Sequence, residues 1–229
     1  MEEDPHTKLT NYMLRIFNYF LVIFLFISNI TLAEKINVFE FTENELSKLK
    51  VKKVRGADAK TDYTLGNNEN GKYIRANANN SASGLGKEIK INLNKTPFLN
   101  ITWKVEKDLR GIDEQSKKGH DYAARVFVVK KTGATPLSNR AMNYVFSSNN
   151  EVNTYHRSPF TKKSIDYVLS TTKEYLNKWV TVKVNVKEHF KKFHNLDLEE
   201  INGVAIMADT DNSKLNSVSY YQNIYFSSN

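Results

Sequence analysis

The chain of 229 residues contains no cysteine. This absence excludes disulfides, thiolate nucleophiles, zinc–thiolate sites and a lipid-modified N-terminal cysteine. A phosphate-binding glycine loop is also missing, because Gly84 and Gly86 are followed by neither a third glycine nor a helix pattern. There is no Gly-x-Ser-x-Gly element and no signature of a nucleic-acid-binding module. We therefore predict no nucleic-acid partner and none of the common nucleotide-binding or serine-hydrolase sites.

Basic residues outnumber acidic ones. The chain has 33 lysines and arginines against 25 aspartates and glutamates, which gives a formal net charge of +8. A basic surface favours anionic partners such as anionic glycans, lipid head groups or cell-wall polymers. A solvated lysine-rich face that only keeps the protein soluble is the alternative.

One apolar run stands near the N-terminus. Residues 19–27 carry no charge, and the small residues Thr31 and Ala33 follow them. This pattern is typical of a secretory signal peptide, and the run is shorter than the roughly 20 residues that a membrane-spanning helix needs. An uncleaved anchor over residues 14–32 is the alternative.

The first residues do not fit a signal peptide, because residues 2–4 are acidic where positive charge is usual. Met13 followed by Arg15 is a better start, so we predict that translation begins at Met13. We expect residues 1–33 to be an N-terminal extension and signal peptide, residues 34–229 to be one domain, and the protein to be periplasmic or secreted by a bacterium.

Alternating apolar and polar residues predict strands through most of the region after residue 34. In residues 180–186 every second residue is valine, which is typical of a half-buried strand. Residues 68–71 (Asn-Glu-Asn-Gly) predict a hairpin turn. The Asn- and Ser-rich stretch 77–86 predicts a loop. Further strands are expected at residues 89–93, 101–105, 126–129, 203–207 and 218–226.

Helices are few in this pattern. Asn185 can cap a short amphipathic helix over residues 186–194, and residues 43–50 predict a second short one. Many short strands separated by turn signals indicate an all-β fold. We predict a single antiparallel β-sandwich or jelly roll with one or two short helices.

The stretch from Met207 to Ser213 is rich in oxygen ligands. It holds Asp209, Asp211 and Asn212 directly after a predicted buried strand. Carboxylate and amide oxygens suit Ca²⁺, although the stretch is not an EF-hand loop because Lys214 stands where glycine is required. The alternative is a network of Asx turns in which these side chains bind their own backbone.

A second polar segment leads into the predicted strand 126–129. Arg125 enters that strand, and a buried guanidinium is costly without a carboxylate partner. Asp121, Asp209 or Asp211 can supply the partner. The cluster is either a structural ion pair that joins two loops or a set of polar groups that holds a hydroxylated or anionic ligand.

Aromatic residues can stack on sugar rings. Alternation places Trp103 and Trp179 near the core. Tyr155 and His156 lie in the polar stretch after Phe146, where we expect them to be exposed.

Four stretches of the chain together resemble the domain of unknown function 3047 family, whose members are exported bacterial proteins. Residues 101–105 resemble its tryptophan-containing strand, and residues 118–128 resemble a Gly-Asp-Asp segment followed by Ala-Ala-Arg and an aromatic-valine strand. Residues 143–147 resemble a Tyr-Val-Trp stretch. Residues 203–212 and 220–226 resemble the family's ending, with Asp-Thr-Asp-Asn as its most specific part.

The chain departs from this pattern at three places. His120 stands for the first family aspartate, Phe146 for the tryptophan and Gln222-Asn223 for a Gly-Asp pair. Two carboxylates that would join a metal or ligand cluster are therefore missing. The resemblance implies an architecture and an exported location, but no reaction. The tyrosine-rich last strand is similar to the ending of many jelly-roll carbohydrate-binding modules.

We predict an exported, non-catalytic binding module for a glycan or another hydroxylated or anionic envelope ligand, with no cofactor. Ca²⁺ at Asp209 and Asp211 is the alternative for the cofactor. One alternative function is a structural or assembly protein of the cell envelope without a small-molecule ligand. Another is a hydrolase or lyase acting on a polysaccharide, with Asp121 and Asp209 or Asp211 as acid and base. The expected ligand contacts are Asp121, Arg125, Asp209, Asp211, Asn212, Tyr155 and His156.

Overall fold

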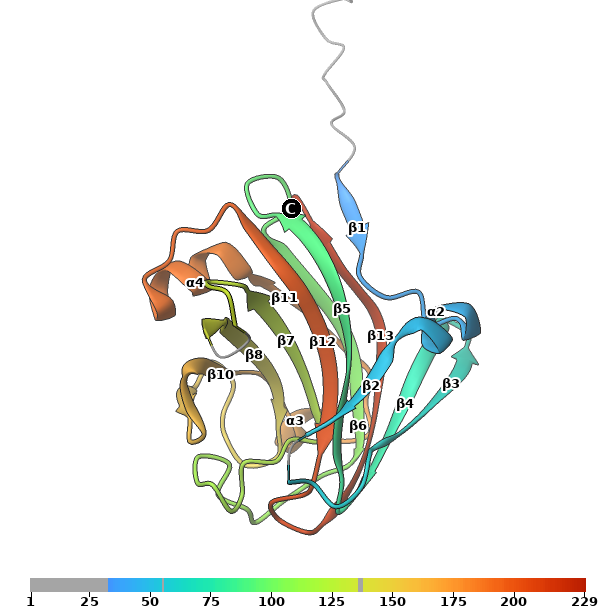
Figure 1. Ribbon diagram of the computed structural model, residues 1–229. Helices are drawn as coiled ribbons and strands as arrows, with labels where there is room; N and C mark the ends of the chain where they lie inside the picture. The colour runs from blue at the N-terminus through green and yellow to red at the C-terminus, as the bar shows by residue number, and fades with distance from the viewer. Residues whose placement is uncertain (1–32, 55, 136–137) are drawn as a thin grey trace, which may run out of the picture. The chain divides into compact units, whose positions relative to one another are not determined.

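The computed structural model describes residues 33–54, 56–135 and 138–229 (Figure 1). The predicted signal peptide and the predicted start at Met13 lie outside these residues and stay predictions. Residues Glu34–Asn229 form one compact unit. Within the described parts of the chain, no helix is both long enough and apolar enough to cross a membrane.

Six strands form one sheet. Its hydrogen-bonded order is β11-β6-β13-β4-β3. Strand β1 lies off this path and pairs with β13, which also pairs with β6 and β4. Every strand pair in this sheet is antiparallel. The strands are β1 (Lys35–Asn37), β3 (Asp62–Asn68), β4 (Gly71–Asn79), β6 (Phe98–Lys107), β11 (Val180–Asn185) and β13 (Asn216–Ser227).

The other sheet has seven strands in the order β2-β5-β12-β7-β8-β10-β9. One of its pairs, β8 with β10, is parallel, so the sheet is mixed and not purely antiparallel as predicted. The chain leaves β8, adds β9 at the edge and returns as β10 between the two. The strands are β2 (Lys50–Lys53), β5 (Ala82–Asn92), β7 (Ala124–Lys130), β8 (Arg140–Ser147), β9 (Tyr155–Ser158), β10 (Thr161–Thr171) and β12 (Glu200–Asp209).

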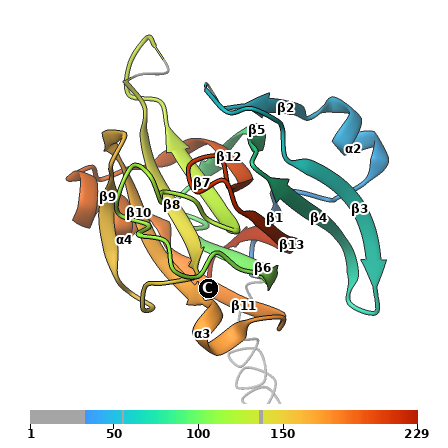
Figure 2. The ribbon, with the colours of Figure 1, turned by 90° about the horizontal axis from the view of Figure 1, so that it is seen from below.

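The two sheets pack face to face around one core (Figures 1 and 2). Trp103 of β6 is fully buried there; its ring centroid lies 5.4 Å from that of Phe146 in β8, and its indole N–H donates to Ser170 Oγ at 3.0 Å. Burying aromatic and β-branched side chains between two sheets is the main force that stabilises this architecture. The predicted all-β sandwich of jelly-roll type is confirmed.

Three short helices accompany the sheets in the described residues, one more than the upper prediction: α2 (Glu43–Lys48), α3 (Thr172–Tyr175) and α4 (Val186–His194). The predicted cap of α4 is present, since Asn185 Oδ1 accepts from the N–H of Glu188 at 3.1 Å. The helix turns Val186 and Phe190 into the core. Helix α4 therefore has the amphipathic pattern that the sequence shows.

Two local expectations are wrong. Residues 77–86 are not a loop, because β4 runs to Asn79 and β5 begins at Ala82, so that only a tight turn separates them. Alanines at every second position fill the buried face of β4, and the Asn residues between them point outward. Trp179 is only half-buried; it precedes β11 and packs against Tyr73 and Tyr220, each with a centroid separation of 6.0 Å.

Candidate ligand-binding site

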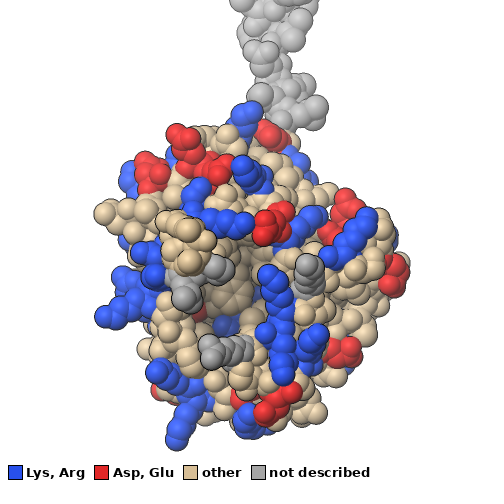
Figure 3. Space-filling model, in the orientation of Figure 1, with Lys and Arg blue, Asp and Glu red and all other residues tan. Residues whose placement is uncertain are grey.

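The outer face of the seven-stranded sheet carries a pocket of about 420 Å³. This volume lies within the range of roughly 300–1,000 Å³ that is usual for ligand pockets. Figure 3 shows the corresponding face of the molecule hollowed, with lysine and arginine side chains around the hollow. Among the residues that line it are six from three strands of this sheet: Arg125 and Phe127 of β7, Met207 and Asp209 of β12, and Ser164 and Asp166 of β10.

Strand alternation explains why polar groups collect here. Val126 and Val128 of β7 point into the core, so the residues beside them in the sequence point to the opposite face. Arg125 therefore stands on the pocket floor. The continuous apolar run that predicted this strand did not distinguish the two faces, because Phe127 lines the pocket as an apolar residue.

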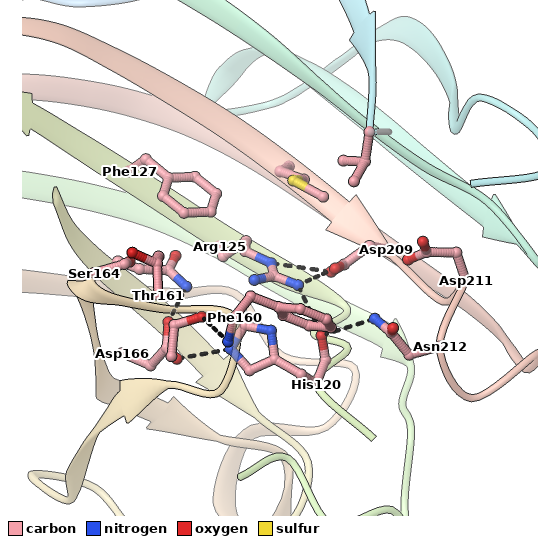
Figure 4. Close-up of a pocket in the computed structure, with 14 residues that line it drawn as sticks. His120, Arg125, Phe127, Phe160, Thr161, Ser164, Asp166, Asp209, Asp211 and Asn212 are labelled. Carbon is pink, nitrogen blue, oxygen red and sulfur yellow. Dashed lines mark hydrogen bonds and ion pairs between the residues drawn. The ribbon is translucent and has the colours of Figure 1, made fainter. Parts of the chain in front are cut away.

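Arg125 and Asp209 form a buried ion pair across two adjacent strands (Figure 4). The Nε of Arg125 donates to Asp209 Oδ1 at 2.9 Å, and its Nη2 donates to Oδ2 of the same carboxylate. Burial lowers the pKa of Arg125, but the charge and hydrogen bonds of Asp209, together with the charge of Asp166, raise it overall, so the guanidinium stays charged. Of the three partners that the sequence allowed, Asp209 is the one that pairs with Arg125.

Asp121 does not pair with Arg125 but binds the loop after β12. Its carboxylate accepts from the N–H of Asn212 at 3.2 Å, from Asn212 Nδ2 at 2.9 Å and from the N–H of Ser213 at 2.6 Å. Asp121 is fully buried and orders the loop after β12 from the neighbouring segment. The acceptor for these loop amides therefore lies outside the loop, which differs from the network of Asx turns in which the loop's own side chains bind its backbone.

A second buried carboxylate, Asp166 of β10, stands on the other side of the pocket (Figure 4). His120 Nε2 lies 2.7 Å from Asp166 Oδ2, and Asn143 Nδ2 donates to its Oδ1. Burial alone would raise the pKa of Asp166, but the hydrogen bond from His120, the charge of Arg125 and the Asn143 amide together lower it. Asp166 is therefore a carboxylate held in the ionised form.

Two aromatic rings provide apolar walls. Phe160, in the turn between β9 and β10, is 57% exposed, and its ring centroid lies 5.6 Å from that of His120 in an edge-to-face arrangement. Phe127 lies on the floor beside Arg125 (Figure 4). An exposed phenylalanine at the rim of a polar pocket is a natural stacking surface for the C–H face of a sugar ring.

Three polar groups of the pocket remain unused within the described residues. Arg125 Nη1 takes part in no hydrogen bond and points away from Asp209 (Figure 4). Asn143 is fully buried and its Oδ1 has no partner. Asp211 lines the pocket without an ion pair, and its carboxylate has no hydrogen-bond partner beyond its own backbone N–H; burial together with Asp121 raises its pKa. Asn143 Oδ1 is closed to solvent, so the described part of the pocket offers a ligand one charged donor, Arg125 Nη1, and the carboxylate of Asp211 as acceptor.

Asp121, Asp209 and Asp211 each place one oxygen within 4.8 Å of the others. This is the cluster in which the sequence suggested Ca²⁺. Both oxygens of Asp209 accept from Arg125, and both oxygens of Asp121 accept N–H groups. Calcium needs six to eight oxygen ligands. Asp211 alone has free oxygens, so this arrangement does not fit a calcium ion without rearrangement, and calcium binding stays a prediction.

Four of the residues predicted for the site line the pocket: Arg125, Asp209, Asp211 and Asn212. Asp121 is not among the lining residues and instead binds Asn212 and Ser213 in the loop after β12. His156 does not line the pocket; its Nε2 bonds the hydroxyl of Tyr122 at 3.0 Å and its Nδ1 lies 3.6 Å from Asp166.

Tyr155 is 54% exposed, as expected, but it lies apart from the pocket-lining residues. It belongs to strand β9 and packs on Phe193 of α4, with a centroid separation of 4.6 Å. The residues that sequence reasoning missed include His120, Asn143, Phe160 and Asp166. A polar residue at every second position, Ser164 and Asp166, was the available signal for β10.

The fold and the pocket define a β-sandwich of jelly-roll type with a polar cleft on the outer face of one sheet. The chain belongs to a family of proteins of unknown function (DUF3047), which matches residues 47–225. The predicted family is therefore confirmed. A search among curated proteins finds no match.

Solved structures with a similar chain path include carbohydrate-binding modules and glucanases. A family 30 carbohydrate-binding module of a cellulosomal cellulase from Clostridium thermocellum is 7% identical, with 84% of this chain and 96% of that chain covered and a TM-score of 0.47. A xyloglucanase domain of NopAA from Sinorhizobium fredii, in complex with cellobiose, is 10% identical, with 77% and 92% covered and a TM-score of 0.43.

A thermostable cellulase derived from Cel12A of Rhodothermus marinus is likewise 10% identical, with 85% of this chain and 96% of that chain covered and a TM-score of 0.45. At these identities the likeness concerns the fold alone. A function has to be argued from the pocket itself.

Proposed function

We propose that this protein is an exported, non-catalytic binding module that holds a sugar unit of a glycan in the pocket between Arg125 and Phe160. The observation that carries the proposal is a pair of unused polar groups: Arg125 Nη1 and the Asp211 carboxylate both belong to one pocket. A hydroxyl group both donates and accepts, so a polyol can satisfy this donor and this acceptor at once.

The walls support the same ligand class. A sugar ring has apolar C–H faces and polar edges, and the pocket combines the Phe127 and Phe160 rings with those polar groups. The Arg125 guanidinium is positioned before the ligand arrives, because Asp209 and the carbonyl of His120 already hold it. Preorganisation of this kind lowers the entropic cost of binding.

Binding is favoured over catalysis by the state of the carboxylates. Glycoside hydrolysis needs one carboxyl group as acid and another as base or nucleophile. Asp209 is bound to Arg125, Asp121 to the Asn212–Ser213 backbone and Asp166 to His120 and Asn143. Among the described pocket residues, Asp211 alone is a carboxylate free to act.

The test is a glycan array followed by titration calorimetry on the ligands retained. We expect at least one glycan to bind and to raise the melting temperature, since a ligand of the folded state alone stabilises it. Replacing Phe160 by alanine should weaken binding about three- to tenfold, the usual worth of an aromatic stacking contact.

The control is Leu215→Ala, because Leu215 is also an exposed apolar residue, 42% exposed, and does not line the pocket. It should bind as the unchanged protein does. Retention of no glycan, or equal affinity of Phe160→Ala and the unchanged protein, contradicts the proposal. Shortening of a bound oligosaccharide during the titration would instead favour an enzyme.

A further inference from the structure

Acidic groups prevail among the described residues of the pocket, although the protein is basic. These residues include three carboxylates, from Asp166, Asp209 and Asp211, beside the guanidinium of Arg125. Asp209 balances the charge of Arg125, and Asp166 faces His120. The charge of Asp211 is balanced by no ion pair within the described residues. Among the described residues of the pocket, the negative charge of Asp211 therefore remains unbalanced.

The surface around the pocket carries positively charged residues. Lys52 and Lys53 directly precede the lining residue Val54, and Lys162 directly follows the lining residue Thr161. These three lysines are exposed, and Figure 3 shows basic side chains around the hollow. Surface lysines act over about 10 Å and are screened by salt, whereas a carboxylate inside the pocket acts on a ligand in direct contact with it.

A ligand with a carboxylate and a ligand with a hydroxyl at the same position therefore interact differently with Asp211. The hydroxyl can donate to Asp211 and gain a charge-assisted hydrogen bond. A carboxylate has no proton to donate and is repelled, by about 2–3 kcal/mol for two charges roughly 6 Å apart at an effective dielectric constant of 20, or about 30- to 150-fold in affinity.

We propose that the pocket takes an uncharged hydroxylated sugar and that Asp211 is the residue that excludes acidic sugars. This inference rests on the proposed function, because it assigns the ligand class of the same pocket. The Arg125 charge does not reverse this preference, since Asp209 holds two of its donor atoms in a bidentate ion pair. The unused Nη1 is then a donor to a neutral oxygen.

The experiment compares matched pairs of probes that differ only in the C6 group of each sugar unit. The β-1,4-linked tetrasaccharides of glucose, mannose and galactose are titrated beside the tetrasaccharides of glucuronate, mannuronate and galacturonate, in which carboxylates replace the C6 hydroxymethyl groups. The titrations are made at pH 8 in 0.3 M salt, where carboxylates are ionised and surface attraction by lysines is screened. We expect the neutral member of the bound pair to bind at least tenfold more tightly.

The variant Asp211→Asn tests whether the charge of Asp211 excludes acidic sugars. The amide keeps an oxygen acceptor but loses the charge, so affinity for the neutral probe should fall about threefold and affinity for the uronate should rise at least tenfold. Asp197→Asn is the matched control, since Asp197 is exposed and lies outside the pocket. It should change neither affinity, and thermal melting should show both variants folded.

Each result decides between the two proposals. A uronate that binds the unchanged protein as tightly as its neutral counterpart overturns the exclusion and leaves glycan binding in place. An unchanged ratio of the two affinities in Asp211→Asn overturns the role of Asp211. Failure of all six probes together with an empty glycan array overturns the proposed function, and the inference with it.

Discussion

Arg125 serves two purposes with one guanidinium. Its Nε and Nη2 hold Asp209 across the β7–β12 pair, and its Nη1 is left for the pocket. The plane of the group lies near two aromatic rings, with the Tyr122 centroid 4.8 Å and the Phe127 centroid 5.7 Å from its central carbon. A lysine could not do both, because an ammonium group lacks the planar fork that makes two parallel hydrogen bonds.

We expect Asp209→Ala to lower the free energy of unfolding by about 3–5 kcal/mol, because it leaves a buried guanidinium without its counter-ion. Urea unfolding followed by circular dichroism measures the loss. The double replacement Arg125→Met with Asp209→Leu should recover most of it, since an apolar pair of similar volume needs no counter-ion. A single variant as stable as the unchanged protein would show that the ion pair contributes nothing.

His189 of α4 is the residue from which we expect a pH dependence of stability. Burial and the charge of Lys192 lower the pKa of His189 to about 4, and its Nδ1 has no partner in the described structure. In the unfolded chain the pKa is near 6.5. The folded state therefore takes up the proton less readily, and stability is full above pH 6.5 and is lost as the pH falls from 6.5 to about 4.

After allowance for partial exposure, that loss is about 1–2 kcal/mol. His189→Phe keeps the ring contact with Tyr167, where the centroids lie 4.4 Å apart, and does not titrate. The unchanged protein should lose more stability than this variant between pH 6.5 and 4, measured by urea unfolding at several pH values. Parallel pH profiles of the two proteins would contradict the assignment to His189.

The strands β8 and β10 decide where the pocket lies. Their parallel pairing puts Asp166 of β10 opposite Asn143 of β8, and the β9–β10 turn then brings Phe160 over His120. Polar Ser164 and Asp166 at alternate positions indicate a strand with one polar face. The pattern carries no information on the neighbouring strand, because a strand's partner depends on long-range packing.

Helix α4 is the element that the sequence described most fully. Asn185 caps it, and the residues from Val186 to His194 have an apolar side that packs on the core. We expect Asn185→Ala to lower the free energy of unfolding by about 1 kcal/mol, because the N–H of Glu188 loses its acceptor.

Asn185→Asp should retain the stability of the cap, since a carboxylate accepts the same hydrogen bond. Urea unfolding measures both variants. Equal loss in the alanine and aspartate variants would mean that the capping bond is not the cause.

The net charge of the whole molecule has consequences that are separate from those of the pocket. With a net charge of +8 it should be retained by acidic polysaccharides in general at low salt. This attraction acts between exposed charges, so about 0.5 M salt should abolish it. Binding in the pocket should persist, because its hydrogen bonds and stacking contacts are not screened in this way.

Affinity electrophoresis of the protein in gels with an acidic or a neutral polysaccharide, at low and high salt, separates the two effects. Retention in the neutral gel should survive the salt, and retention in the acidic gel should not. Retention in the acidic gel at high salt would instead indicate specific recognition of the acidic polymer.

The residue pattern alone was enough to predict the sandwich, helix α4, the hairpin after Asn68 and a partner for Arg125. Each of these depends on local periodicity, on a capping residue or on the cost of burying a charge. It was also enough to gather Arg125, Asp209, Asp211 and Asn212 as candidates, because they stand beside the ends of two apolar strands.

The tertiary structure decided which carboxylate pairs with Arg125, and that His120, Asn143, Phe160 and Asp166 complete the pocket while Tyr155 does not. These residues come from separate segments of the chain, and strand order and register bring them together. Order and register follow from packing of the whole core, so a sequence pattern that reports one strand at a time cannot contain them.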